Sequence, residues 1–177
     1  MIDFSRNHFE LLGLRPQFRI DGAMLDTAYR ALQASVHPDR HAQADDAQRR
    51  AALQASARVN EAYATLKDPV LRAQYLLRLQ GVEAVGDADT RLPFEFLEEQ
   101  LERREAAEDA RNAGDDRKLA ALLNEVRAAA DALEARVGDE LDDAHAYDAA
   151  RTHVRQLTFL AKLAQDLDEM LAALDDR

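Results

Sequence analysis

Residues 21–39 read DGAMLDTAYRALQASVHPD. Apolar side chains recur in this stretch at spacings of three and four, namely Leu25, Ala28, Tyr29, Leu32 and Val36. Such spacing predicts a helix with one apolar face, for which Asp21 is a suitable N-cap and Pro38 the end. From Pro38 to Asp46 the chain is polar and has no periodic apolar face. The tripeptide His37-Pro38-Asp39 is therefore expected where this helix passes into a loop.

Three further helices are expected around this segment. A short one covers residues 4–12 and stops at Gly13, and a longer one follows the loop and runs to about Lys67. The longer helix has an apolar stripe of Ala52, Ala55, Val59, Tyr63 and Leu66. Asp68 and Pro69 then open a fourth helix as N-cap and first residue, and Gly81 ends it.

The second half of the chain predicts a separate helical bundle. Residues 81–91 contain two glycines and three acidic residues without periodicity, which is typical of a linker. Beyond them three long helices are delimited by Pro93, by Gly114-Asp115-Asp116 and by Gly138. The middle helix has a seam of Leu119, Leu122, Val126, Ala130, Leu133 and Val137, and the last one of Tyr147, Ala150, Val154, Leu157, Ala161, Ala164 and Leu171. We expect an all-α protein whose C-terminal part is an antiparallel three-helix bundle.

Composition narrows the class of protein. The 177 residues include no cysteine, so disulfides and thiolate metal sites are excluded. The net charge of −11 is uneven: residues 1–80 hold 11 Lys and Arg against 9 Asp and Glu, and residues 81–177 hold 12 against 25. The acidic half argues against a nucleic-acid partner, because phosphates would repel it. No run of 18 uncharged apolar residues is present, so we expect no membrane partner and a cytoplasmic location.

Enzyme chemistry finds little support in the sequence. His37 and His41 are four residues apart, but Pro38 breaks the helical geometry that a metal pair would need. His145 and His153 have no fixed carboxylate partner, and we expect them to be surface histidines. Phosphate-binding glycine loops and nucleophile motifs are also missing from the sequence. We therefore expect neither an enzyme nor a cofactor.

The His37-Pro38-Asp39 loop suits recognition better than catalysis. Pro38 fixes the backbone, Asp39 offers a carboxylate to a partner's arginine or amide, and His37 supplies a donor and a flat surface. Downstream the chain reads Asn60-Glu61-Ala62-Tyr63 and Arg72-Ala73-Gln74-Tyr75. With these segments, roughly the first 78 residues resemble the J-domain family.

In J-domains a helical hairpin presents the HPD tripeptide at its tip. The resemblance implies that His37, Pro38 and Asp39 dock on the ATPase domain of a DnaK-class chaperone and couple its hydrolysis to client capture. Family members usually carry basic residues on the helix before the tripeptide, which steer the docking. Here Arg30 is the only cation within that helix and Arg40 follows the tripeptide, so these two are the expected secondary contacts.

The second half narrows the resemblance to one group of J-proteins. Residues 96–105 read FLEEQLERRE and residues 155–163 read RQLTFLAKL, which resembles the HscB family of iron–sulfur cluster assembly. The resemblance implies a J-domain at residues 1–80, a linker at 81–91 and a bundle at 92–177. It also implies a chaperone of the HscA class as partner and the scaffold protein IscU as the client of the bundle.

In that family an apolar patch with flanking acids binds the scaffold. The matching positions here are Leu97, Glu98, Leu101, Glu102, Glu105 and Phe159. Leu97, Leu101 and Glu105 lie at i, i+4 and i+8 and so share one helix face. Some relatives carry methionine where this chain has Glu98, so the patch here is smaller or more polar.

Three alternatives remain open at this point. Spacing alone favours a place in the bundle core for Leu97 and Leu101, and Phe159 competes with Leu157, Leu160, Ala161 and Leu163 for the buried stripe. A J-protein with a different client would share the first half of the chain. A helical dimerisation protein would use the seam of residues 119–137 between chains.

Overall fold

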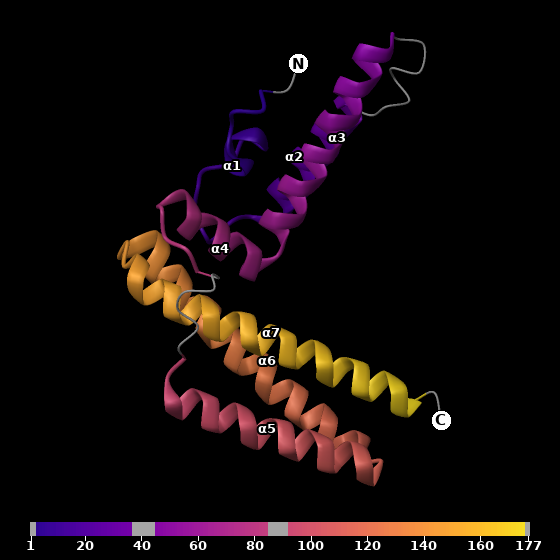
Figure 1. Cartoon of the computed structure of the whole chain (residues 1–177), viewed down its shortest axis with the longest axis vertical. Coiled ribbons are helices and arrows are strands. Elements are labelled where there is room, and N and C mark those ends of the chain that lie inside the picture. The colour runs from indigo at the N-terminus through magenta and orange to yellow at the C-terminus, as the bar shows by residue number, and fades with distance from the viewer. Residues whose placement is uncertain (1–2, 37–44, 85–91, 176–177) are drawn as a thin grey trace. The chain divides into compact units, whose positions relative to one another are not determined.

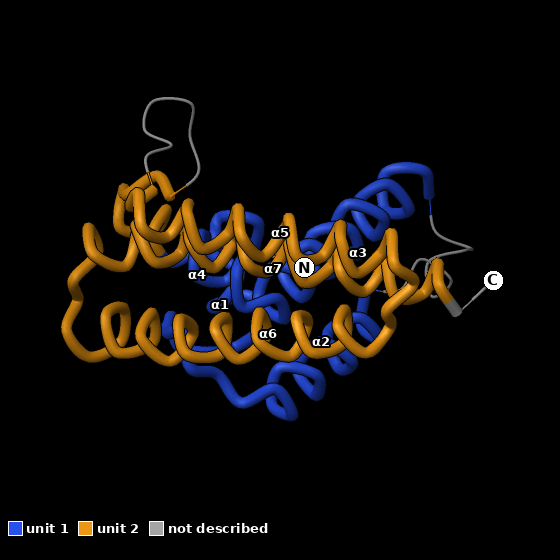
Figure 2. Tube along the Cα trace, turned by 90° about the horizontal axis from the view of Figure 1, so that it is seen from below, with its two compact units in different colours: residues 1–76 blue, residues 77–177 orange. Residues whose placement is uncertain are grey.

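The computed structural model describes residues 3–36, 45–84 and 92–175, and within these ranges it contains helices and no strand. The predicted all-α class is thereby confirmed. The chain divides into two compact units, residues 1–76 and residues 77–177, which Figure 2 colours separately. The expected domain bounds at residues 80 and 91 stay predictions, and residues 85–91 of the expected linker lie outside the described ranges.

Unit 1 is built around a pair of helices, α2 (Gly22–Val36) and α3 (Asp46–Lys67), which lie side by side along their length in Figure 1. The short α1 (His8–Leu11) packs on α3, and α4 (Pro69–Leu79) follows and begins in this unit. The side chains at the centre of the unit are those of Phe9, Leu25, Val59, Ala62 and Leu66. Their burial supplies the main driving force for the unit.

The predicted starts of α2 and α4 are confirmed by their caps. The Asp21 carboxylate accepts hydrogen bonds from the backbone N–H groups of Ala23 and Met24 at 2.8 and 3.2 Å. The Asp68 carboxylate accepts one from Leu71 N–H at 2.9 Å, with Pro69 in the first helical position. Both aspartates satisfy donors that the first helical turn leaves without partners.

The first helix is shorter than the prediction of residues 4–12. It begins at His8 because Asn7 forms a capping box: its side chain accepts from Glu10 N–H, and the Glu10 carboxylate accepts from Asn7 N–H. Phe4 consequently lies outside the helix and is exposed. The pattern of apolar residues placed the start too early because it ignored this local cap.

Unit 2 contains the three long helices α5 (Phe94–Ala113), α6 (Asp116–Gly138) and α7 (Tyr147–Asp175), which run lengthwise together in Figure 1. The turn between α5 and α6 forms as predicted, with Gly114 at φ 66° and Asp115 capping α6 through Lys118 N–H. The most extensive contact is between α6 and α7, and α5 packs on both. The core is formed by Ala107, Ala110, Leu119, Leu123, Val126, Leu160, Leu163 and Leu167.

One detail of the predicted bundle is wrong and another is incomplete. Gly138 ends α6 as predicted, but the chain continues in a helical path through a π-turn, η2 (Asp139–Asp143), with Leu141 buried. The chain reverses at His145, which adopts a left-handed φ of 51°. In α7 the expected seam position Ala161 is exposed, and Leu160, Leu163 and Leu167 are buried instead. Larger side chains gain more from burial, so the leucines rather than the alanine face α6.

Candidate functional site

The HPD tripeptide belongs to the segment that connects α2 and α3. His37, Pro38, Asp39 and Arg40 lie outside the described residues, so their predicted roles stay predictions. The helices on both sides are described, since α2 ends at Val36 and α3 begins at Asp46 with Asp45 as its N-cap. These two helices form the hairpin whose connecting segment contains the tripeptide.

Aromatic and polar contacts join the two hairpin helices. The rings of Tyr29 on α2 and Tyr63 on α3 stack with centroids 4.0 Å apart. The Tyr63 hydroxyl donates to the Asp26 carboxylate at 2.8 Å and accepts from Lys67 Nζ at 2.7 Å. The hydrogen bond to Tyr63 is the main reason that the pKa of Lys67 is raised above its ordinary value. These contacts fix the first half of α2 against the last turns of α3.

We expect the Tyr63→Phe variant to be less stable by about 1 kcal/mol, because it keeps the stacked ring and loses the hydroxyl between Asp26 and Lys67. The midpoint of urea unfolding, compared at equal slope, measures this loss. Tyr29→Phe is the matched control: it removes only an exposed hydrogen bond to Asn60 and should lower stability less. Equal midpoints for Tyr63→Phe and the parent chain would contradict the role of this hydroxyl.

Arg30 is exposed on α2, and its Nε donates to the Asp26 carbonyl one turn earlier at 3.2 Å. Because the side chain is exposed, the cation is accessible to a partner. Its predicted role as a secondary chaperone contact fits this position and stays a prediction.

The segment Arg72-Ala73-Gln74-Tyr75 has a structural role that the sequence did not reveal. Arg72 donates from Nη1 to the Leu66 carbonyl at 2.6 Å, and its guanidinium lies 4.9 Å from the centre of the Phe18 ring. The Tyr75 hydroxyl accepts a hydrogen bond from the backbone N–H of His8 at 2.9 Å, and the rings of His8 and Tyr75 stack on each other. Arg72 and Tyr75 thus fasten α4 to the end of α3 and to α1. Phe18 and His8 are distant from Arg72 and Tyr75 in sequence, so only the tertiary structure identifies them as partners.

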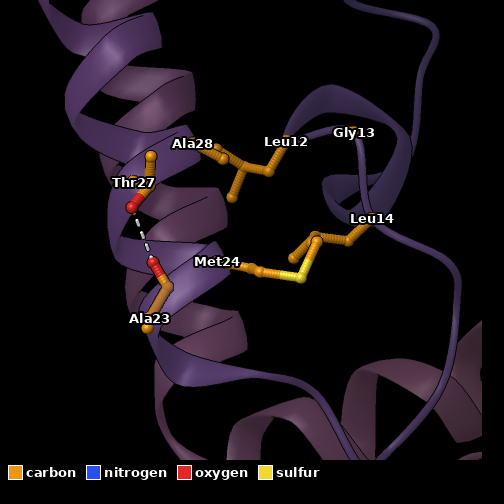
Figure 3. Close-up of a pocket in the computed structure, with 7 residues that line it drawn as sticks. All are labelled: Leu12, Gly13, Leu14, Ala23, Met24, Thr27 and Ala28. Carbon is orange, nitrogen blue, oxygen red and sulfur yellow. Dashed lines mark hydrogen bonds between the residues drawn. The ribbon is translucent and has the colours of Figure 1, made fainter.

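A shallow pocket of about 410 Å³ lies in unit 1 beside the first half of α2 (Figure 3). Its lining is apolar apart from one hydroxyl, and the lining residues are Leu12, Gly13, Leu14, Ala23, Met24, Thr27 and Ala28. That hydroxyl, on Thr27, donates to the Ala23 carbonyl at 2.8 Å, which Figure 3 marks with a dashed line. The lining therefore offers no acid or base for chemistry.

Of the two histidines of unit 2, His145 has the expected surface position and His153 does not. His145 is exposed, and its Nδ1 lies 3.1 Å from the Leu141 carbonyl oxygen. His153 is largely buried, and its Nδ1 lies 2.9 Å from the Glu140 carboxylate, which also pairs with Arg136. His153 and Glu140 join α7 to the π-turn. Within the described ranges no three His, Asp or Glu side chains gather as a metal site would require.

The outer face of α5 carries the predicted scaffold-binding residues. Leu97 and Leu101 are 44% and 59% exposed, so the bundle core does not contain them. Glu98, Glu102 and Glu105 are exposed beside them. The opposite face of α5 packs inward, and it presents Phe96, Gln100, Ala107 and Ala110. The contact with the rest of the bundle is thus made by mostly small side chains, and the two leucines remain on the surface.

Phe159 of α7 lies next to this face. Its ring is half-buried and meets the Phe96 ring edge-on, with centroids 5.8 Å apart and planes at 81°. The guanidinium of Arg104 lies 5.0 Å from the centre of the Phe159 ring. Arg104 follows Leu101 by three residues and is its neighbour on the helix. The structure therefore brings Phe159 to the edge of the apolar and acidic face of α5, between two α5 side chains that the sequence did not single out.

This arrangement is suited to binding a protein surface. Exposed leucines with an aromatic ring at their edge form an apolar area that a partner can cover. The carboxylates around it favour a partner whose own apolar area is bordered by lysine and arginine.

Two family models match the chain. The DnaJ domain matches residues 7–75, and the HSCB C-terminal oligomerisation domain matches residues 92–168. Each match falls in one of the two structural units.

Relatives of similar length match along the whole chain. A co-chaperone protein HscB homolog of Azoarcus sp. (strain BH72) is 43% identical over 99% of both chains. A protein of the same description from Ralstonia nicotianae is 46% identical over 97% of this chain and 98% of its own length.

Solved structures agree with these matches. Chaperone HscB from Vibrio cholerae has a TM-score of 0.85 at 39% identity, covering 96% of this chain and 99% of its own. Human co-chaperone protein HscB has a TM-score of 0.87 at 26% identity, covering 94% and 82%. The similarity therefore extends across both units, each with its own fold.

Proposed function

Because the chain belongs to the HscB family of J-domain co-chaperones, we propose that His37, Pro38 and Asp39 bind an ATPase of the HscA class while the bundle binds the IscU scaffold protein. HscB co-chaperones act in iron–sulfur cluster assembly, and an Hsp70-class chaperone is the partner of the J-domain. Our proposal also names IscU as the client, assigns the individual contact residues and places the protein in the cytoplasm.

The observation that carries the scaffold assignment is the exposure of Leu97 and Leu101. Spacing alone favoured the bundle core, and that would have left no apolar patch for a client. Both side chains are on the surface with carboxylates beside them and with Phe159 at their edge. This is the combination of apolar patch and flanking acids that the family resemblance implies.

A dimerisation role for the seam of residues 119–137 has no support in the structure. Leu119, Val126 and Val137 are 0% exposed within the single chain. Leu119 and Val126 pack in one cluster with Leu160, Leu163 and Leu167 of α7. The seam is thus already occupied by the chain's own last helix.

Membranes and nucleic acids are not among the partners that we propose. Within the described ranges, no helix combines the length and the apolar character needed to cross a bilayer. The carboxylates of α5 would also repel phosphate groups.

The scaffold assignment predicts a salt-dependent contribution from the α5 carboxylates. We expect the double variant Glu102→Gln, Glu105→Gln to bind IscU about five- to ten-fold more weakly at low ionic strength, because two favourable charges at the rim are lost. The difference should shrink as salt rises, since screening weakens the same attraction in the parent chain. Titration calorimetry at two salt concentrations measures both effects.

The matched control removes two charges from another helix. Glu125 and Asp131 are exposed on α6, and Glu125→Gln with Asp131→Asn changes the net charge of the bundle by the same amount. We expect this control to bind IscU with nearly the parent affinity. Equal weakening by both double variants would mean that net charge, rather than the face of α5, guides the scaffold.

A further inference from the structure

Phe94, the first residue of α5, has a large apolar side chain on the surface. It is 72% exposed, more than the 59% of Leu101 and the 44% of Leu97. The core of the unit draws on Phe96 two residues later, and Phe94 is not part of the cluster around it. An exposed aromatic ring beside other exposed apolar side chains extends the apolar area that another molecule can cover.

The position of Phe94 places it in line with the two leucines. Phe94, Leu97 and Leu101 lie at i, i+3 and i+7, which brings their side chains onto one helical stripe. Seven residues of α-helix span about 10 Å along the axis. The exposed apolar stripe therefore begins at the first residue of α5 and extends over two turns.

Glu98 explains why the extension matters in this chain. It lies between Leu97 and Glu99 on α5, and it is exposed. A carboxylate there offers no apolar area in the middle of the patch. Phe94 supplies apolar area one turn nearer the start of the helix.

The carboxylates around the stripe define the chemistry of the partner. Glu95, Glu98, Glu102 and Glu105 are all exposed on α5. A surface that covers Phe94, Leu97 and Leu101 must itself be apolar at its centre and must bring lysine or arginine to these carboxylates. The scaffold client of the proposed function is the occupant to which we assign this face.

We infer that Phe94 is a binding residue for the scaffold client and that it supplies, one turn before Glu98, apolar contact area that the Glu98 carboxylate does not offer. The inference rests on the proposed function and deepens it, because it identifies where the partner's apolar surface must reach. The partner has to extend to the first turn of α5, rather than only to the turns that carry Leu97 and Leu101.

Titration of the full-length chain with purified IscU tests the inference. We expect Phe94→Ala to weaken binding at least about five-fold, as truncation of an aromatic contact residue does, and Phe94→Leu to retain most of the affinity. Leu53→Ala is the matched control, because Leu53 is 57% exposed on α3 in the other unit; its affinity should equal that of the parent chain. Circular dichroism should show unchanged helix content in all three variants.

A further variant tests whether apolar area at position 98 can stand in for Phe94. In the Phe94→Ala background, Glu98→Met should recover most of the lost affinity, because it restores apolar area at the neighbouring turn. If Phe94→Ala binds IscU with the parent affinity while the double variant Leu97→Ala, Leu101→Ala loses binding, the inference is wrong and the proposed function stands. If Phe94→Ala and the double variant both bind with the parent affinity, the inference and the proposed function are both wrong.

Discussion

The Asp39→Ala variant is expected to stimulate the chaperone ATPase no more than buffer does, and His37→Ala the same. In the proposed complex the Asp39 carboxylate makes a charge-assisted contact with an arginine or amide of the chaperone. Removal of one partner from such a contact costs about 2–5 kcal/mol. That corresponds to roughly 30-fold to several-thousand-fold weaker binding. Steady-state hydrolysis with increasing co-chaperone measures the loss.

The same variants should leave the bundle unaffected. Residues 37 and 39 precede α3, whereas the predicted client face belongs to α5 and α7 in the other unit. Binding of IscU by Asp39→Ala should therefore equal that of the parent chain. Stimulation that persists in both Asp39→Ala and His37→Ala would refute the docking role of the tripeptide.

The second large effect concerns the client. We expect the triple variant Leu97→Ala, Leu101→Ala, Phe159→Ala to bind IscU at least about 100-fold more weakly, since truncation of an apolar anchor at a binding surface costs roughly 1–2 kcal/mol. The losses need not add, because the side chains are neighbours. Calorimetric titration or a pull-down with purified scaffold measures the change.

Folding controls separate this effect from damage to the bundle. Leu97 and Leu101 are exposed, so their truncation should hardly change the stability of the bundle. Phe159 packs on Phe96 and under Arg104, and its truncation should lower stability to a small extent. Basal stimulation of the ATPase by the triple variant should stay at the parent level. Parent affinity for IscU in a folded triple variant would remove IscU as the client and leave the J-domain assignment in place.

Much of the fold was predictable because its determinants are local. Asp21, Asp68-Pro69 and Gly114 mark helix ends through side-chain caps or a backbone angle that neighbours in sequence decide. The predicted start of α1 was wrong because the Asn7 capping box sets it, and the spacing of apolar residues does not indicate a cap. Gly138 ends α6 as predicted, but the π-turn that follows it was not predicted, because the spacing of apolar residues does not indicate a π-turn.

The candidate site could be predicted only in part, for a physical reason. Helical spacing indicates which residues share a face of a helix. It does not indicate which face packs against the other helices. On α5 the covered face carries Gln100 and two alanines, and the leucines are exposed, which reverses the usual expectation. Likewise the contact of Arg104 with Phe159 joins residues 55 positions apart, which spacing within one helix cannot reveal. The family resemblance placed the predicted site mainly on α5, and the structure added which of its side chains are accessible.

One measurement tests the central claim that a single chain couples a chaperone to its scaffold client. The steady-state ATPase rate of the HscA-class chaperone is measured with the co-chaperone alone, with IscU alone and with both together. We predict that the rate with both exceeds the sum of the two separate stimulations, and that Asp39→Ala and the triple variant each abolish this excess. Purely additive rates with the parent chain would contradict the account.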